Sequence, residues 1–109
     1  MKRGEIWTLQ DDQYASKARP VVIVQSDSIG EFNSVILALL TTFDNADAPT
    51  RVMIEPSESN GLHQTSFVMT EKLVTVRRSD LGLRLGTLTN LQMGAVSHQL
   101  AVVLDIVGS

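Results

Sequence analysis

The chain has 109 residues and a mass of 11.9 kDa, the usual size of one domain, and no shift in composition marks a second one. It contains no cysteine, which excludes disulfides, thiolate metal sites and thiol nucleophiles. The formal net charge of -3 and the pI near 5.2 argue against a broad electrostatic surface for duplex nucleic acid, because such binding needs many Lys and Arg contacts to phosphate.

The N-terminal segment predicts neither export nor a membrane anchor. It starts basic with Lys2 and Arg3 but is polar by Gln10, so it lacks the apolar region of a signal peptide. No stretch reaches the roughly 18 apolar residues that a membrane span needs. We therefore expect a soluble, cytoplasmic protein without a membrane partner. A domain of this size buries a modest share of its surface, so a homodimer with a shared apolar face is also expected.

Most of the chain has patterns typical of β-strands. The predicted strands cover residues 4–9, 20–24, 34–41, 51–54, 66–69, 73–77 and 84–88. The run 20–24 is continuously β-branched after Pro20, which is typical of a strand buried on both faces with Pro at its first position. Turn formers at 26–33 and at 79–82 predict short turns or helical loops.

The C-terminal segment predicts a helix. Thr89 and Gln92 have the spacing of a capping box, so the helix should start there. Apolar residues at helical spacing form a stripe that should cover the sheet, and Gly108 is the expected stop. The stripe consists of Val96, Leu100, Val103, Leu104 and Val107. The predicted fold is mainly β with short helices: a small curved barrel closed by a C-terminal α-helix.

Common catalytic signatures are missing from the sequence. It has no phosphate-binding or dinucleotide glycine pattern, no His-Glu-x-x-His metal motif and no Gly-x-Ser-x-Gly turn. The two histidines, His63 and His98, could form the acid-base pair of a ribonuclease. However, His63 falls in a polar loop and His98 lies off the apolar stripe, so the sequence favours reading both as solvated polar residues.

Arg19 lies between a polar loop and the strand of residues 20–24, which would hold its backbone in place. Its guanidinium matches phosphate oxygens and stays charged, so it can stabilise the extra negative charge of a phosphoryl transition state. The alternative is a surface ion pair with Asp11 or Asp12. Thr41 and Thr42 are either an ordinary strand end or, if they face Arg19, hydroxyl donors to a phosphate.

Several segments together resemble the MazF/PemK endoribonuclease toxins of type II toxin-antitoxin systems, and the match covers nearly the whole chain. The segments are GEIW at residues 4–7, RPVVIV at 19–24 with Ser26 after it, LLTT at 39–42, GL at 61–62, and residues 66–76, which include EKLVTV. Each segment is weak alone, but the series in this order is specific.

The resemblance implies an SH3-like barrel, a single toxin domain over residues 1–109 and a homodimer. It also implies an mRNA interferase that cleaves single-stranded RNA at short motifs, without a metal or any other cofactor. The 2'-hydroxyl of the substrate would attack the adjacent phosphate. The family's catalytic Arg and Thr fall on Arg19, which would stabilise charge and could donate a proton, and on Thr41, which would position the phosphate.

The resemblance further implies that Thr42, Ser66 and Glu71 contact RNA. The first loop departs from the family pattern, so the cut-site sequence does not carry over, and here Tyr14 or Lys17 would stack on a base or meet a phosphate. A cognate MazE-like antitoxin with a disordered acidic tail is expected to occlude this groove.

Two other functions fit the same fold. A CcdB-like gyrase poison acts through the C-terminal end of the helix and resembles chains with a Trp-bearing tail, whereas residues 104–109 contain no Trp, which favours the nuclease. In a plain SH3-like interaction module, neither Arg19 nor Thr41 would matter.

Overall fold

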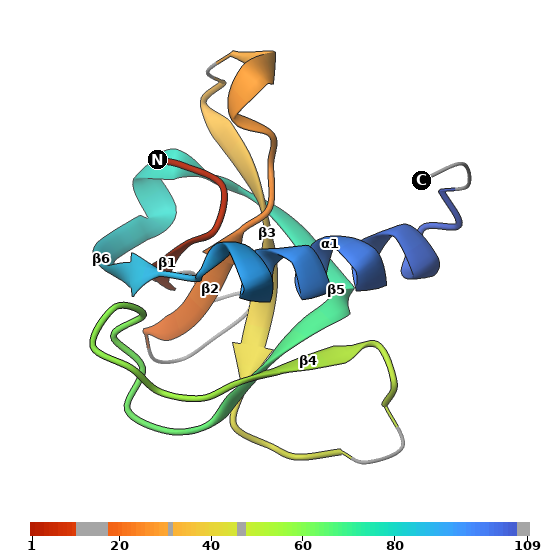
Figure 1. Cartoon of the computed structure of the whole chain (residues 1–109). Helices are drawn as coiled ribbons and strands as arrows, with labels where there is room; N and C mark the ends of the chain where they lie inside the picture. The colour runs from red at the N-terminus through yellow and green to blue at the C-terminus, as the bar shows by residue number, and fades with distance from the viewer. Residues whose placement is uncertain (11–17, 31, 46–47, 107–109) are drawn as a thin grey trace.

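The computed structural model describes residues 1–10, 18–30, 32–45 and 48–106 (Figure 1). Within these ranges, the elements in chain order are strands β1 (Glu5–Leu9) and β2 (Arg19–Ile23), the 3-10 turn η1 (Asp27–Ile29), strands β3 (Ser34–Thr41), β4 (Arg51–Ile54) and β5 (Ser66–Arg77), the 3-10 turn η2 (Arg78–Asp80), strand β6 (Leu81–Thr87) and helix α1 (Asn90–Val103). Among the described residues, no helix has both the length and the apolar character needed to cross a membrane.

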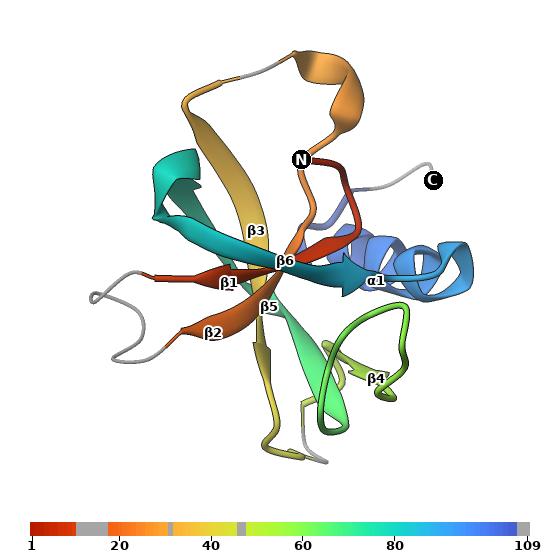
Figure 2. The same cartoon turned by 90° about the vertical axis from the view of Figure 1, so that its left-hand side faces the viewer.

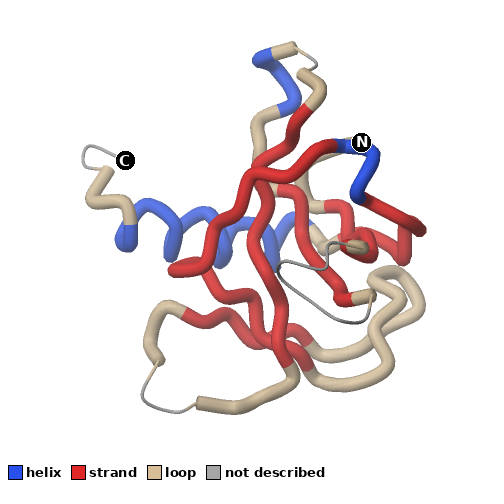
Figure 3. Tube along the Cα trace, turned by 180° about the vertical axis from the view of Figure 1, so that it is seen from behind, coloured by secondary structure: helices blue, strands red, loops and turns tan. Residues whose placement is uncertain are grey.

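The strands form one antiparallel sheet with the order β4-β5-β3-β2-β1-β6. The sheet is strongly curved, and α1 lies across one side of it, in front of the strands in Figure 1 and behind them in Figure 3. The predicted mainly β fold, a small curved barrel with a C-terminal helix, is confirmed. Edge strands β4 and β6 are not paired with each other. Instead, the loop that follows β4 reaches β6, where the Thr87 N–H donates to the Ser59 carbonyl at 2.8 Å.

Both faces of the sheet are buried. One apolar cluster fills the inside of the curve beneath α1, and its residues are Ile6, Val22, Ala38, Leu40, Ile54, Leu62, Val68, Leu88, Met93, Val96 and Leu100. The cluster on the other face consists of Leu9, Val21, Ile23, Val35, Leu37, Leu39, Met69 and Val76. Strand β2 contributes to both, so its predicted burial on two faces is confirmed.

Strand β5 is continuous, whereas the sequence predicts two separate strands with a break at residues 70–72. The break is instead a shift of register against β3, since Ala38 pairs with Leu73 and the next residue, Leu39, pairs with Met69. The extra residues bend the strand, which lets it follow the curve of the barrel.

Helix α1 begins as predicted. The Thr89 hydroxyl accepts from the Gln92 N–H at 3.1 Å, and the Gln92 side chain accepts from the Thr89 N–H at 2.9 Å. From the predicted stripe, Val96 and Leu100 are buried but Leu104 is exposed. The helix residues buried against the sheet are Met93, Val96 and Leu100.

The prediction that the helix runs on to Gly108 is wrong, because α1 ends at Val103. Asp105 adopts a φ of 55°, a left-handed conformation that Asp takes more readily than most residues. This turns the chain so that the Ile106 N–H donates to the Ala101 carbonyl at 2.9 Å and closes the helix. Residues 107–109 lie outside the described residues, and they include Val107 and Gly108 of the predicted helix end.

Glycine lets the loop after β4 lie against β6. Gly61 has a φ of +70°, and a Cβ there would overlap with the Leu85 carbonyl. Gly86 faces the loop from the other side, where a Cβ would overlap with the Ser59 carbonyl. The two backbones therefore approach more closely than any other residue type would allow.

Asn60 fixes the shape of the same loop from inside. Its side chain is fully buried, and its Oδ1 accepts from the N–H groups of Ser57 and Leu62, both at 3.0 Å. Its Nδ2 donates to the Glu55 carbonyl at 2.9 Å. Three bonds from one buried amide make this loop a rigid wall.

We predict that Gly61→Ala lowers the free energy of unfolding by roughly 2–4 kcal/mol. Alanine is strained at the positive φ of this position, and its Cβ would clash with the Leu85 carbonyl. Urea denaturation measures this. The matched control is Gly94→Ala in α1, where a Cβ meets nothing within 4 Å. An alanine in an exposed helix interior should raise stability by about 0.5–1 kcal/mol. Equal stability of Gly61→Ala and the wild type would contradict the close approach of loop and strand.

Candidate active site

The pairing of β2 with β3 brings Arg19 and Thr41 together. In this pair Val21 lies opposite Leu39, and Ile23 lies opposite Leu37. Continuing the register by two residues places Arg19 opposite Thr41. Directly opposed residues of an antiparallel pair point to the same face, with Cβ atoms about 4.5–5.5 Å apart. Two residues that are far apart in the sequence therefore meet at one end of the sheet.

A hollow of about 180 Å³ opens at this end. Its lining comes from the start of β2, the end of β3 and the start of β5, and consists of Arg19, Pro20, Leu40, Thr41, Thr42 and Ser66. Four of the residues predicted for the site, Arg19, Thr41, Thr42 and Ser66, are thus brought together.

Hydrogen bonds hold the polar groups of this hollow. Arg19 Nη2 donates to the Leu40 carbonyl at 3.2 Å, which fixes the guanidinium beside the end of β3. Thr41 Oγ1 accepts from the Phe43 N–H at 3.1 Å, and a hydroxyl that accepts one bond can still donate its own proton. Sequence reasoning missed the Leu40 carbonyl, because its position depends on strand register. A held cation beside a hydroxyl donor is suited to an anion such as a phosphate.

Ser66 is almost entirely buried, at 3% exposure, and its hydroxyl donates to the Gln64 carbonyl at 3.0 Å. It thereby ties the end of the loop after β4 to the start of β5. Ser66 lines the hollow, and its hydroxyl bond stabilises the loop.

Glu71 lies apart from the hollow, on the bulge of β5. Its Oε2 lies 3.0 Å from Arg51 Nη2, and its Oε1 accepts from the Thr50 hydroxyl at 2.8 Å. Partial burial on its own would raise the pKa of Glu71. Hydrogen bonds from its own backbone N–H, Thr50 and Arg51, with the charge of Arg51, outweigh this and lower the pKa below the ordinary 4.5.

The other candidates are not gathered here. His63 lies in the loop after β4, His98 is exposed on α1, and neither lines this hollow. Tyr14 and Lys17 lie outside the described residues. Across the described ranges, no group of three or more His, Cys, Asp or Glu side chains could hold a metal ion.

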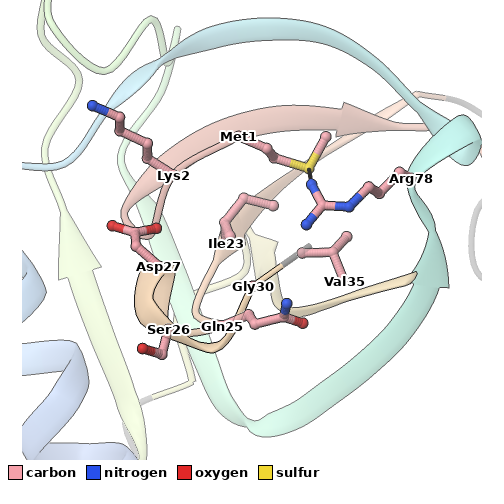
Figure 4. A pocket seen from close by; sticks show the side chains of 9 residues that line it. All are labelled: Met1, Lys2, Ile23, Gln25, Ser26, Asp27, Gly30, Val35 and Arg78. Carbon is pink, nitrogen blue, oxygen red and sulfur yellow. Dashed lines mark hydrogen bonds between the residues drawn. The ribbon is translucent and has the colours of Figure 1, made fainter. Parts of the chain in front are cut away.

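Another hollow, of about 410 Å³, lies at the opposite ends of β2 and β3 (Figure 4). Two of its charged side chains, Arg78 and Asp27, bind neighbouring parts of the chain. Arg78 donates to Met1 Sδ at 3.2 Å and to the Phe32 carbonyl, and the Asp27 carboxylate accepts from the Arg3 N–H at 2.8 Å. These bonds join the N-terminal segment to η1 and η2, so the groups that make them have a structural role.

Comparison with known proteins finds one family over almost the entire chain. The family model described as PemK-like, MazF-like toxin of type II toxin-antitoxin system matches residues 2–104. A protein of Mycolicibacterium smegmatis named probable endoribonuclease MazF is 40% identical over 110 residues, which cover 99% of this chain and 100% of that protein. The endoribonuclease MazF of Staphylococcus saprophyticus is 30% identical over 112 residues, covering 97% of this chain and 92% of that one.

The fold is likewise similar to that of solved structures. A mycobacterial endoribonuclease solved in complex with its cognate antitoxin superposes with a TM-score of 0.82 at 27% identity, covering 97% of this chain and 96% of that chain.

The lowered pKa of Glu71 predicts a pH-dependent contribution to stability. The carboxylate contributes fully above its unfolded pKa, near 4.5, and the contribution is lost as the pH falls through the lower folded value. Glu71→Gln should therefore be less stable than the wild type at pH 7, and the difference should shrink as the pH is lowered below 4.5. The side chain is 31% exposed, so solvent screening keeps the difference modest.

Urea denaturation at pH 7 and at a series of acid pH values measures this difference. Glu58→Gln, at an exposed position of the loop after β4, is the control and should match the wild type at each pH. A Glu71→Gln deficit that persists unchanged at acid pH would show that the ion pair is not its source.

Proposed function

The chain belongs to the PemK-like, MazF-like toxins of type II toxin-antitoxin systems, which are endoribonucleases, and we propose that it cleaves single-stranded RNA with Arg19 and Thr41 as its catalytic residues. The observation that carries this proposal is the β2–β3 register, which sets these two residues opposite each other beside the hollow. The family match does not favour the alternative of a CcdB-like gyrase poison.

In the proposed reaction, the 2'-hydroxyl of a ribose attacks the adjacent phosphate. A bond forms between O2' and phosphorus as O2' loses its proton. The bond to the 5'-oxygen of the next nucleotide breaks and that oxygen takes up a proton, so the products are a 2',3'-cyclic phosphate and a 5'-hydroxyl. A guanidinium stays protonated at neutral pH, so Arg19 supplies fixed positive charge to the phosphate oxygens. The Thr41 hydroxyl donates to one of them and orients the phosphate. These steps draw on no cofactor.

The proposal includes further contacts to RNA. Thr42 lines the same hollow as Arg19, which supports its contact with the RNA backbone. For Glu71, the support is the resemblance of the sequence to the family. For Tyr14 and Lys17, it is their residue types, which suit stacking on a base and contact with a phosphate. Ser66 contributes by holding the Gln64 carbonyl at the edge of the hollow.

The proposal includes two protein partners, a second copy of the chain and a cognate antitoxin, and a site of action in the cytoplasm, where mRNA is found. Helix α1 carries no charged residue, and its outer face exposes Leu91 at 87% and Val102 at 59%. An apolar surface of this kind is typical of a protein contact. The antitoxin complex of the mycobacterial relative supports the second partner.

We predict that Arg19→Ala lowers the rate of RNA cleavage at least about 100-fold, the loss typical of removing one charge-stabilising donor. The assay uses purified protein and an unstructured RNA, with a chelator present throughout. Arg19→Lys keeps the charge but loses the planar guanidinium, so its cleavage rate should lie between those of the wild type and Arg19→Ala. Arg77→Ala, which removes a side chain that is 78% exposed, is the control. Undiminished cleavage by Arg19→Ala, or a need for added metal, would refute the mechanism.

Thr41→Val should lower the cleavage rate roughly 10- to 100-fold, because it keeps the β-branched shape and removes the hydroxyl. Thr41→Ser restores the hydroxyl and should recover most of the rate. The same assay measures both, with thermal melts to show that each variant is folded. If Thr41→Val and Thr41→Ser are equally active, the hydroxyl has no part in the reaction.

A further inference from the structure

A second hollow, of about 330 Å³, adjoins the one at Arg19 and Thr41. The two share Pro20, Thr42 and Ser66, so they meet at the ends of β2 and β3. We call this second hollow the side pocket. Apart from the shared residues, it is lined by Thr8, Ala18, Gly61, Leu62, His63, Gln64 and Leu85.

We propose that the side pocket holds one unpaired base of the RNA next to the cleaved phosphate, and that Gln64 and His63 select that base. This inference rests on the proposed function, since the phosphate at Arg19 and Thr41 fixes where the neighbouring base can lie. It adds a specificity site in the loop after β4, beside the residues proposed for the cleavage step.

The walls of the side pocket suit the flat faces of a base. Leu62, Leu85 and Pro20 give it apolar sides, and a small number of polar groups lie among them. Pockets for planar ligands have this composition, in which apolar walls supply contact area and a few polar groups fix orientation. Sequence-specific recognition of RNA relies on single-stranded bases that are splayed out in this way.

The polar groups that would read the base lie on one short segment. Gln64 offers an amide donor beside an amide acceptor, and His63 offers an imidazole. Within the described residues, neither side chain makes a hydrogen bond, so both can bind a base without breaking an existing one. Adjacent donor and acceptor groups can form paired hydrogen bonds with a base edge.

The segment is held in place before RNA arrives. The Gln64 carbonyl accepts from the buried Ser66 hydroxyl at 3.0 Å, and the Leu62 N–H donates to the buried Asn60 side chain at 3.0 Å. Gly61 brings the same segment against the backbone of Leu85. A wall that is fixed in advance loses little entropy on binding and can discriminate between bases.

To test this, the purified protein and its variants cleave a pool of RNAs with random sequence, and sequencing of the products gives the bases around the cut sites. For Gln64→Ala and His63→Ala, we expect the wild-type preference at one position beside the cut to fall at least about tenfold, as for loss of one base contact. Preferences at the other positions should remain. Gln64→Glu replaces a donor with an acceptor, so it should change the preferred base at that position.

Gln99→Ala and His98→Ala, which remove the same residue types from α1, are the matched controls and should keep the wild-type cut sites. If both side-pocket variants keep the wild-type preference at every position, the inference is wrong. A uniform loss of rate with unchanged preferences also overturns it, because that result assigns the loop a structural part only. A wild-type protein that cuts no RNA in the pool overturns the proposed function, and this inference with it.

Discussion

Strands β2 and β3 pair with Val21 opposite Leu39, and a slip of this register by one residue would turn every side chain of one strand to the opposite face. Burial on both faces opposes such a slip, because it would exchange the two buried apolar sets and lose the close packing that each makes with its own face. The same register sets Arg19 against Thr41 at the strand ends, where the apolar packing stops. The core of the molecule thus determines the position of its charged centre.

The loop after β4 positions the neighbouring side pocket, as the strand register positions Arg19 and Thr41. The sheet does not close by strand pairing, and this loop bridges the edge strands through Ser59 and Thr87. Asn60 and Gly61 give it one shape, and that shape forms a wall of the side pocket. Barrel closure and the proposed base selection therefore depend on the same few bonds.

Much of the fold could be predicted from local signals. The β-branched run after Pro20 and the capping box at Thr89 each identify an element, because burial and helix capping act over a few residues. The end of α1 is not predictable in this way, because Asp105 adopts a conformation usually taken by glycine, whereas the local pattern points to Gly108. The bulge in β5 cannot be told from a break between two strands, since both interrupt the apolar pattern in the same way.

The site was predictable only in part. Residue types and the family resemblance single out Arg19 and Thr41, but the residues alone left open whether Arg19 is a surface ion-pairing residue. Its bond to the Leu40 carbonyl and its place opposite Thr41 depend on strand register, and no short-range pattern encodes that. The side pocket depends on the folding of a loop with few regular features, so residues such as Gln64 carried no signal in the sequence.

The central claim, that Arg19 and Thr41 act on one phosphate, is tested most directly by a double-mutant cycle on single-turnover RNA cleavage. The account predicts that Arg19→Ala with Thr41→Val is little slower than Arg19→Ala alone, because residues that act as a unit are strongly non-additive. Losses that multiply fully, as for two independent sites, would contradict it.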